Sequence, residues 1–224
     1  MPDRKNIRVL FYIAAVVFII CIPVLLLASN IRLIANDLYL HQYEFDKYSV
    51  SRETGLSRTE LVEISEEMIS YLNSGSIGNA MSIFTGNEIK HLSDVRSLIQ
   101  ICYILQWATL GYITAFIIAG FICKRKQFLV VFNNLVAAGS TVSVILVVVI
   151  GIAALVDFNW LFILFHHAFF RNGFWVSSGY LPHIYTEGFF SDAGTIIAET
   201  MILESLFIGI VAGFFILRRR RLMN

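Results

Sequence analysis

Cysteine is scarce in this chain, and none of it lies where an exported protein would use it for cross-links. The three cysteines, Cys21, Cys102 and Cys123, fall within or at the end of long apolar stretches rather than in the polar segments between them. No disulfide framework can therefore connect the polar segments. We expect the three thiols to pack as small apolar groups between helices.

The sequence also lacks the common local motifs of catalysis and of nucleotide binding. It contains no G-x-S-x-G elbow, no glycine-rich phosphate loop and no H-E-x-x-H zinc motif. No basic patch with interleaved aromatic residues occurs in the polar segments, which excludes nucleic acid as a partner.

Apolar sequence, by contrast, is abundant. Hydrophobic residues make up 57% of the 224 residues and the mean hydropathy is +0.72, which argues against a soluble protein. Four stretches are long enough to cross a bilayer, which takes roughly 20 helical residues. They begin near Val9, Leu98, Phe128 and Ile196. We therefore predict an all-α polytopic membrane protein with four transmembrane helices.

Charge divides sharply between the segments outside these stretches, although the net charge is only +1. Segments 30–97 and 157–195 together carry 13 acidic and seven basic residues, whereas the two termini and the turn at 124–127 carry ten basic residues and one acidic residue. By the positive-inside rule the basic pieces lie in the cytoplasm. Both termini are then cytoplasmic, and 30–97 and 157–195 form a small, mainly helical extracytoplasmic cap.

These boundaries define the predicted organisation of the chain. The segments are the N-terminal tail with the first span at 1–29, outer segment 1 at 30–97, the second span at 98–123, a cytoplasmic turn at 124–127, the third span at 128–156, outer segment 2 at 157–195, the fourth span at 196–217 and a basic tail at 218–224. We interpret the first span as an uncleaved anchor, because its apolar run is too long for a typical signal peptide.

Outer segment 1 contains one strong helix signal. Ser57 and Glu60 have the spacing of a capping box, and apolar residues follow at helical intervals. We predict an amphipathic helix over 57–72, packed on the rest of the cap or lying at the membrane surface. Residues 43–50 favour a short strand or an extended lead-in. A further helix is expected to begin with Asn87 as its N-cap and to continue into the second span.

All five histidines lie in the two outer segments, at His41, His91, His166, His167 and His183. His91 has Glu88 and Asp94 three residues to either side on one predicted helix, where a carboxylate can orient the imidazole as in a general base. The alternative is a solvated helix face with incidental charged neighbours. His91 precedes Leu98 by seven residues, which places it about 10 Å above the hydrocarbon edge, at headgroup height.

A second pair of histidines interrupts an aromatic run, Trp160–Phe170, that is too short to cross a bilayer. The run is expected to lie at the interface, on a short re-entrant or surface-parallel helix. If it is helical, the rings of His166 and His167 point about 100° apart, so only one of them faces a shared pocket. The alternative is that both histidines merely decorate the interface.

Several other polar residues are candidates at the same level. Glu204 lies inside the fourth span without a basic neighbour, so it faces the bundle or a cavity, either as a functional group or as a protonated structural one. Arg32 or Arg171 can hold a phosphate or polarise a carbonyl. Asn36 and Asp192 complete this polar set.

Four stretches of the sequence carry a family resemblance. YEFDKYSVSRETGLSRTEL, EIKHLSDVRSL, FHHAFFRNGFW and EGFFSDA resemble, in this order, a family of bacterial four-span membrane proteins that includes the lipoprotein intramolecular transacylases. The most specific parts are E-x-x-H-x-x-D-V-x-x-L, which holds His91, and F-H-x-x-F-F followed by G-x-W, which holds His166 and Trp175. The chain departs from the family at Thr186, where a proline is expected.

The resemblance implies an enzyme of the bacterial cytoplasmic membrane whose active face is extracytoplasmic. Its reaction moves an acyl chain from the glyceryl sn-2 ester to the N-terminal amine of a diacylated lipoprotein, without a soluble cofactor. Two outer histidines are catalytic in the family, and by motif position they match His91 and His166. Our hypothesis takes His166 as base and His91 as its partner acid or oxyanion stabiliser, although the two roles are exchangeable. The supporting residues are Glu88, Asp94, His167, Arg171 and Trp175.

Two other functions fit the same residues. One is a non-catalytic membrane protein that binds lipid or lipoprotein or assists assembly, using the same headgroup-level pocket. The other is a membrane hydrolase whose zinc ion is held by His91, His166, His183 and a carboxylate such as Asp192, although these residues show no ligand spacing in the sequence.

Overall fold

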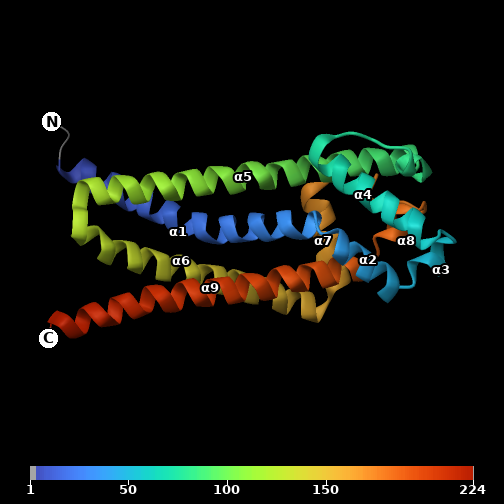
Figure 1. Cartoon of the computed structure of the whole chain (residues 1–224). Helices are drawn as coiled ribbons and strands as arrows, with labels where there is room; N and C mark the ends of the chain where they lie inside the picture. The colour runs from blue at the N-terminus through green and yellow to red at the C-terminus, as the bar shows by residue number, and fades with distance from the viewer. Residues whose placement is uncertain (1–3, 224) are drawn as a thin grey trace. The chain divides into compact units, whose positions relative to one another are not determined.

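The computed structural model describes residues 4–223, which contain helices and their connections but no strand. The α-helices are α1 (Arg4–Ala35), α2 (Leu38–Lys47), α3 (Val50–Thr54), α4 (Arg58–Ser74), α5 (Gly86–Lys124), α6 (Phe128–Val156), α7 (Phe158–Phe169), α8 (Leu181–Ile184) and α9 (Glu187–Met223) (Figure 1). Two short 3-10 helices lie at Ala80–Ile83 and Arg125–Gln127. The predicted all-α class is confirmed.

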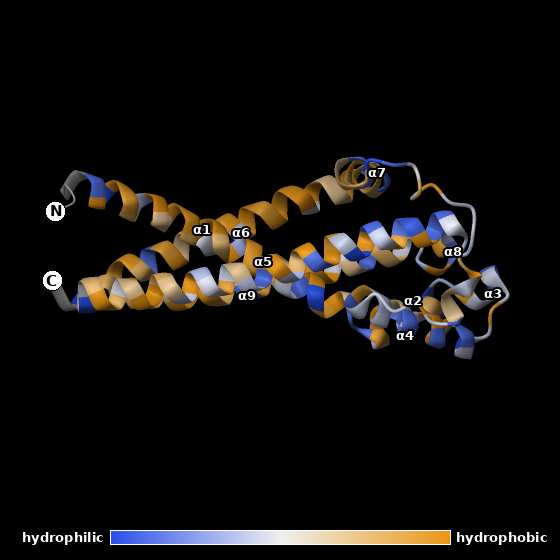
Figure 2. Ribbon diagram, turned by 90° about the horizontal axis from the view of Figure 1, so that it is seen from above, coloured by the Kyte–Doolittle hydropathy of each residue, from blue (hydrophilic) through white to orange (hydrophobic). Residues whose placement is uncertain are grey.

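Four helices, α1, α5, α6 and α9, contain stretches long and apolar enough to cross a membrane. Figure 2 shows mainly hydrophobic residues along these stretches. The four-span prediction is therefore confirmed, whereas the boundaries of each span stay a prediction because the helices continue beyond them. Helix α5 has 39 residues. It is about 58 Å long, roughly twice the hydrocarbon thickness of a bilayer.

The chain divides into two compact units. The membrane unit comprises Met1–Asn30, Ile104–Ile150 and Ala198–Asn224, and the cap unit comprises Ile31–Tyr103 and Gly151–Ile197. Helices α1, α5, α6 and α9 contribute residues to both, whereas α2, α3, α4, α7 and α8 belong wholly to the cap unit.

Small residues allow the helices of the membrane unit to approach closely. A Cβ on Gly139 of α6 would lie 2.4 Å from the Ile22 side chain of α1. Between α1 and α5, the Tyr112 hydroxyl donates a hydrogen bond to the Ala14 carbonyl at 2.8 Å. In this unit the start of α1, the α5–α6 turn and the end of α9 lie at one end (Figure 1). The three basic clusters therefore share one side, as the topology requires, and their cytoplasmic orientation stays a prediction.

The cap unit has its own hydrophobic core, built largely on α4. Ser57 and Glu60 form the predicted capping box, and the helix runs from Arg58 to Ser74. Its predicted apolar face is buried, since Leu61 is fully inaccessible and Ile64 and Met68 are nearly so. The same core includes Phe45, Val50, Tyr71, Leu72, Met81, Phe84, Leu92, Ile184, Tyr185 and Phe189.

Two predictions for outer segment 1 are wrong. Residues 43–50 form no strand, because the Asp37 side chain caps α2 by accepting hydrogen bonds from the backbone of Tyr39 and Leu40. Asn87 is not the N-cap of α5 either. Thr85 and Glu88 cap that helix reciprocally: the Thr85 hydroxyl accepts from Glu88 N at 3.3 Å, and the Glu88 carboxylate accepts from Thr85 N at 2.8 Å.

The cap core predicts a stability difference between two positions on α4. Leu61→Ala should destabilise the protein by about 2–5 kcal/mol, because it leaves a cavity in a fully buried site. Glu63→Ala, on the exposed face, serves as the control. Thermal melting in detergent should show a Tm lowered by roughly 5–15 °C for Leu61→Ala only. Equal melting of the two variants would mean that this core does not limit stability.

Candidate active site

Two imidazoles from distant parts of the chain meet in the cap unit. His91 lies in the second turn of α5, and His166 lies near the end of α7. Their ring centroids are 5.9 Å apart with the planes at 32°. Only 8% of His91 and 7% of His166 is exposed. The pair is close enough for a proton to pass through one bridging group.

Aromatic rings enclose this histidine pair. The His166 ring contacts Phe162 at 4.2 Å, Trp175 at 4.8 Å and Phe170 at 5.4 Å between centroids. Phe170 also lies edge-on to His91 at 4.9 Å. Such an enclosure keeps water from the imidazoles, which strengthens electrostatic interactions there and removes a competing nucleophile.

The protonation of His166 follows from its backbone contact. Its Nδ1 lies 2.7 Å from the Phe162 carbonyl oxygen. A carbonyl oxygen only accepts, so Nδ1 carries the proton and Nε2 has a free lone pair. Burial lowers the pKa of His166 below its ordinary 6.5, the bond to Phe162 opposes this shift, and His167 adds to it. The lowered pKa favours the neutral form of His166, in which Nε2 is available as a base.

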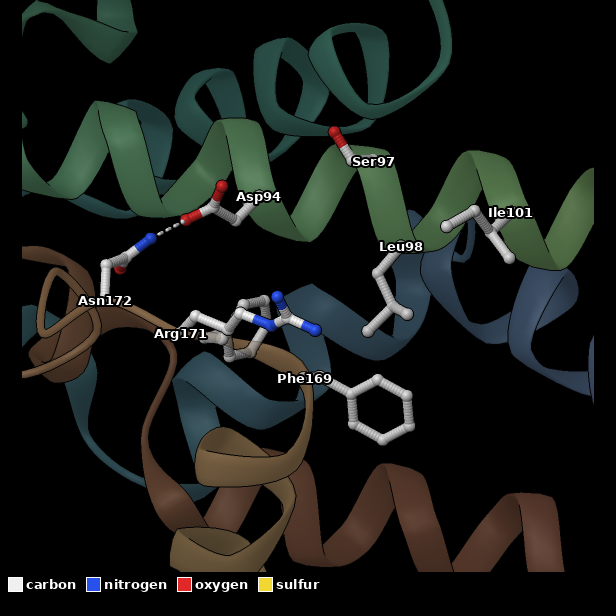
Figure 3. Close-up of a pocket in the computed structure, with 8 residues that line it drawn as sticks. Asp94, Ser97, Leu98, Ile101, Phe169, Arg171 and Asn172 are labelled. Carbon is white, nitrogen blue, oxygen red and sulfur yellow. Dashed lines mark hydrogen bonds between the residues drawn. The ribbon is translucent and has the colours of Figure 1, made fainter.

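The carboxylates predicted to orient His91 bind other partners. Nδ1 of His91 is buried and has no hydrogen-bond partner among residues 4–223. Glu88 is fully buried and accepts from the Leu181 backbone N–H at 2.9 Å, in addition to capping α5. Asp94 accepts from the Asn172 side-chain amide at 2.8 Å (Figure 3). Both acids thus hold the segment that follows α7 against α5 rather than contacting the imidazole.

His167 points in a different direction from His166, as expected for adjacent residues on a helix. His166 is buried, whereas His167 is exposed and lies edge-on to Trp175 at 5.5 Å. Trp175 is half-buried, and its ring contacts both the His166 ring and the His167 ring. Only His166 joins the pair with His91.

An open cleft of about 350 Å³ lies beside the histidine pair. It is lined by residues of α5 and by residues at and after the end of α7, namely Asp94, Ser97, Leu98, Ile101, Phe169, Phe170, Arg171 and Asn172. Figure 3 shows the Arg171 guanidinium in the space between these two elements. Arg171 was predicted as a site residue, but the cleft itself was not. The cleft forms only where two segments that are distant in the sequence meet.

The remaining outer candidates do not join the histidine pair. The Arg32 guanidinium lies over the Tyr103 ring at 4.7 Å. The Asn36 amide donates to the Tyr103 hydroxyl at 2.8 Å and accepts from Asn73 at 2.6 Å. Arg32 and Asn36 therefore brace the end of α1 against α4 and α5.

Asp192 belongs to a separate acidic cluster. It is ion-paired with Lys47 and accepts from the Tyr48 hydroxyl at 2.8 Å. The buried Glu44 carboxyl faces it, and burial, reinforced by Asp192, raises the pKa of Glu44 to about 7. Sequence reasoning missed Glu44 and the buried His41. Their only signal was a spacing of three residues, which one turn of α2 converts into a common face.

The structure does not bring together the ligands that the zinc-dependent hydrolase would need. It requires His91, His166, His183 and Asp192 to converge, but His183 is exposed and Asp192 binds Lys47 and Tyr48. No group of three or more His, Cys, Asp or Glu residues with metal-binding geometry occurs within 4–223.

Glu204 has a structural partner within the membrane unit. The buried Asn30 amide donates to the Glu204 carboxyl at 2.8 Å and to the Leu26 carbonyl at 3.0 Å. This contact joins α9 to α1 and satisfies polar groups inside the spans. The carboxyl thus acts as an interhelical hydrogen-bond acceptor.

These observations define a polytopic membrane protein of four spans whose helical cap holds a buried histidine pair beside a polar-to-apolar cleft. The sequence profile of the family described as lipoprotein intramolecular transacylase Lit matches residues 16–190. The chain belongs to this family.

Solved structures share the fold of this chain. One is the in meso structure of the membrane integral lipoprotein intramolecular transacylase Lit from Bacillus cereus, with a TM-score of 0.80, 18% identity, and coverage of 94% of this chain and 97% of that one. Two others, with a histidine mutated to arginine or to alanine, give TM-scores of 0.77 and 0.78 at 18% and 17% identity. They cover 99% and 98% of this chain and 99% and 100% of theirs. A comparison with curated proteins finds no match.

The Asn30–Glu204 contact predicts a difference between two substitutions. Glu204→Gln keeps an acceptor oxygen for the Asn30 amide and should leave the Tm unchanged. Glu204→Ala removes the acceptor and should cost about 1 kcal/mol, or roughly 2–4 °C of Tm in detergent. If both variants lose the same stability, the charge of Glu204 matters rather than its hydrogen bond.

Proposed function

We propose that this protein moves the acyl chain of the glyceryl sn-2 ester to the N-terminal amine of a diacylated lipoprotein, using His166 as base and His91 as its partner. The observation that carries the proposal is the contact between two buried imidazoles in an aromatic enclosure. The family assignment supports the same class of reaction. A single bound substrate contains both reacting groups, so their orientation supplies much of the rate.

The chemistry needs only proton transfers from the protein. The lone pair of the neutral amine attacks the ester carbonyl carbon; a C–N bond forms and the carbonyl oxygen becomes an oxyanion. Nε2 of His166 takes the proton that the nitrogen loses. The C–O bond to the glycerol then breaks as the carbonyl re-forms, and the leaving sn-2 oxygen receives the proton that His166 accepted, either directly or by relay through His91, which gives up one proton and takes one from His166. The products are an amide and a free hydroxyl, and the protonation of the enzyme is restored.

The tautomer of His166 favours it as the base. Its Nδ1 is committed to the Phe162 carbonyl, so Nε2 is the nitrogen that can accept a proton. His91 has a buried Nδ1 without a protein partner. A buried polar atom left unpaired is costly, which favours a substrate group as its missing partner. This difference supports His91 as the acid or the oxyanion stabiliser.

We further propose that the site faces the extracytoplasmic side. His91 and the basic Lys124 lie toward opposite ends of α5, and their separation of 33 positions corresponds to about 50 Å of helix. Because the basic turn favours the cytoplasm, the opposite end of α5 favours the outer leaflet. There the site would be at the height of lipid headgroups and ester bonds.

The central test is mass spectrometry of a lipoprotein N-terminal peptide. The peptide comes from a strain that makes only diacylated lipoprotein and expresses this chain. Wild type should produce an N-acyl peptide with a free glyceryl hydroxyl. His166→Gln and His91→Gln should each lower conversion by about 100-fold or more, because general acid–base catalysis contributes on that scale.

The matched control is His183→Gln, which alters an exposed histidine of the cap unit and should retain wild-type conversion. Western blotting and detergent melting verify that all variants accumulate and fold. Unchanged diacyl peptide in the strain with wild-type protein would overturn the proposed reaction.

The lowered pKa of His166 predicts the acid limb of the pH profile. The substrate amine, with a pKa of about 8, must lose its proton before it attacks, so log(kcat/KM) against pH has a slope of one below that pH. The slope should rise to two once pH falls through the lowered pKa of His166, since protonated Nε2 cannot act as a base. Glu44→Gln should retain both the slope of one and the slope of two, although Glu44 titrates near pH 7. If the slope of two disappears in Glu44→Gln, the second titration belongs to Glu44 instead of His166.

A further inference from the structure

The cleft beside the histidine pair changes character along its length. Asp94 and Asn172 lie at one end, and the apolar side chains of Leu98, Ile101 and Phe169 line the other (Figure 3). On α5, Ile101 lies seven positions after Asp94, so the cleft covers about 10 Å of helix. The second span is predicted to begin at Leu98. The polar end therefore lies at headgroup height, and the apolar end reaches into the hydrocarbon region.

Arg171 supplies a cation without an acidic partner at this cleft. Among the side chains that the structure describes, the ion pairs are Lys47–Asp192 and Arg58–Asp46, and neither includes Arg171. Asp94, which lines the same cleft, is bound to the Asn172 amide. Asn172 also accepts from the Phe174 backbone N–H at 3.1 Å, which fixes the turn just after Arg171. The guanidinium therefore remains available to a group that binds in the cleft.

Phe170 connects the cleft to the histidine pair. Its ring lines the cleft and also contacts His91 at 4.9 Å and His166 at 5.4 Å between centroids. A molecule in the cleft is therefore one aromatic ring away from both imidazoles. This distance suits one part of a lipid whose reacting part lies at the histidines.

We propose that this cleft is an ester-and-acyl-chain subsite for the diacylglyceryl group. The Arg171 guanidinium donates hydrogen bonds to an ester carbonyl oxygen, and Leu98, Ile101 and Phe169 receive the first methylenes of the attached chain. Arginine fits this role because its donors are charged and its planar fork is fixed. The inference rests on the proposed acyl transfer. The ester is either the one that is transferred or the one that stays on the glycerol.

The test is steady-state kinetics of the purified full-length protein with a synthetic diacylglyceryl-cysteine peptide in detergent micelles. Arg171→Gln should lower kcat/KM by about 10- to 100-fold, because it removes a charged donor from a carbonyl. Arg171→Lys, which keeps the charge, should recover part of the loss. Arg52→Gln, at an exposed arginine of α3, is the matched control and should behave as wild type.

The kinetic constants separate the two esters. A fall in kcat at unchanged KM would place Arg171 at the transferred carbonyl, where negative charge develops in the transition state. A rise in KM at unchanged kcat would place it at the retained ester. Either result supports the subsite. Wild-type kcat and KM in Arg171→Gln, with His166→Gln inactive in the same assay, would overturn it while leaving the proposed function intact.

The apolar end of the cleft has its own test. Ile101→Trp should shorten the space for methylenes and shift the preference of the enzyme toward peptides with shorter acyl chains. Ile104→Trp, three residues further along α5 and outside the lining of the cleft, is the control. The same chain-length profile in Ile101→Trp, Ile104→Trp and wild type would contradict the proposed position of the chain.

Discussion

The surplus length of α5 is the constraint on which the cap and its site depend. A helix of 39 residues is about 58 Å long, so roughly half of it extends beyond a hydrocarbon core of about 30 Å. The extending turns have two useful faces. Leu92, Val95 and Ile99 pack on the cap core. The neighbouring face carries His91 and Asp94. The same rigid element therefore anchors the cap and presents the site.

Burial gives the histidine pair its chemical character. Neutral imidazoles tolerate an apolar enclosure better than charged groups do, and the loss of water lowers the pKa of His166. In the membrane unit, the Glu204 carboxyl accepts a hydrogen bond from the Asn30 amide, so packing between helices explains this carboxyl inside a span. In the cap unit, the histidine pair retains a buried Nδ1 on His91 without a partner in the described part of the chain, and the Arg171 cation beside it has no acidic partner there.

Features governed by local rules were predictable from the sequence. The spans follow from apolar length, α4 from its capping box, and the burial of only one of His166 and His167 from the helical period. The choice of His166 as the buried one came from the family motif. Features that depend on distant contacts were not. Nothing near Glu88 shows that it binds the Leu181 backbone, and nothing near Arg171 indicates a cleft. The strand or extended lead-in predicted at 43–50 is wrong because these residues continue the helix that Asp37 caps and form the turn into α3.

The two carboxylates that were expected to orient His91 determine how freely the aromatic wall can move. Asn172 is bonded to Asp94, and the Leu181 backbone is bonded to Glu88, so the segment between them is fastened to α5 at both ends. The two fastening points lie six residues apart on the helix, or about 9 Å. Trp175 therefore sits on a closed strap rather than on a free loop. Any tilt or rotation of α5 carries His91 and both ends of this strap together, so the spacing between imidazole and indole is coupled to the helix that supports them.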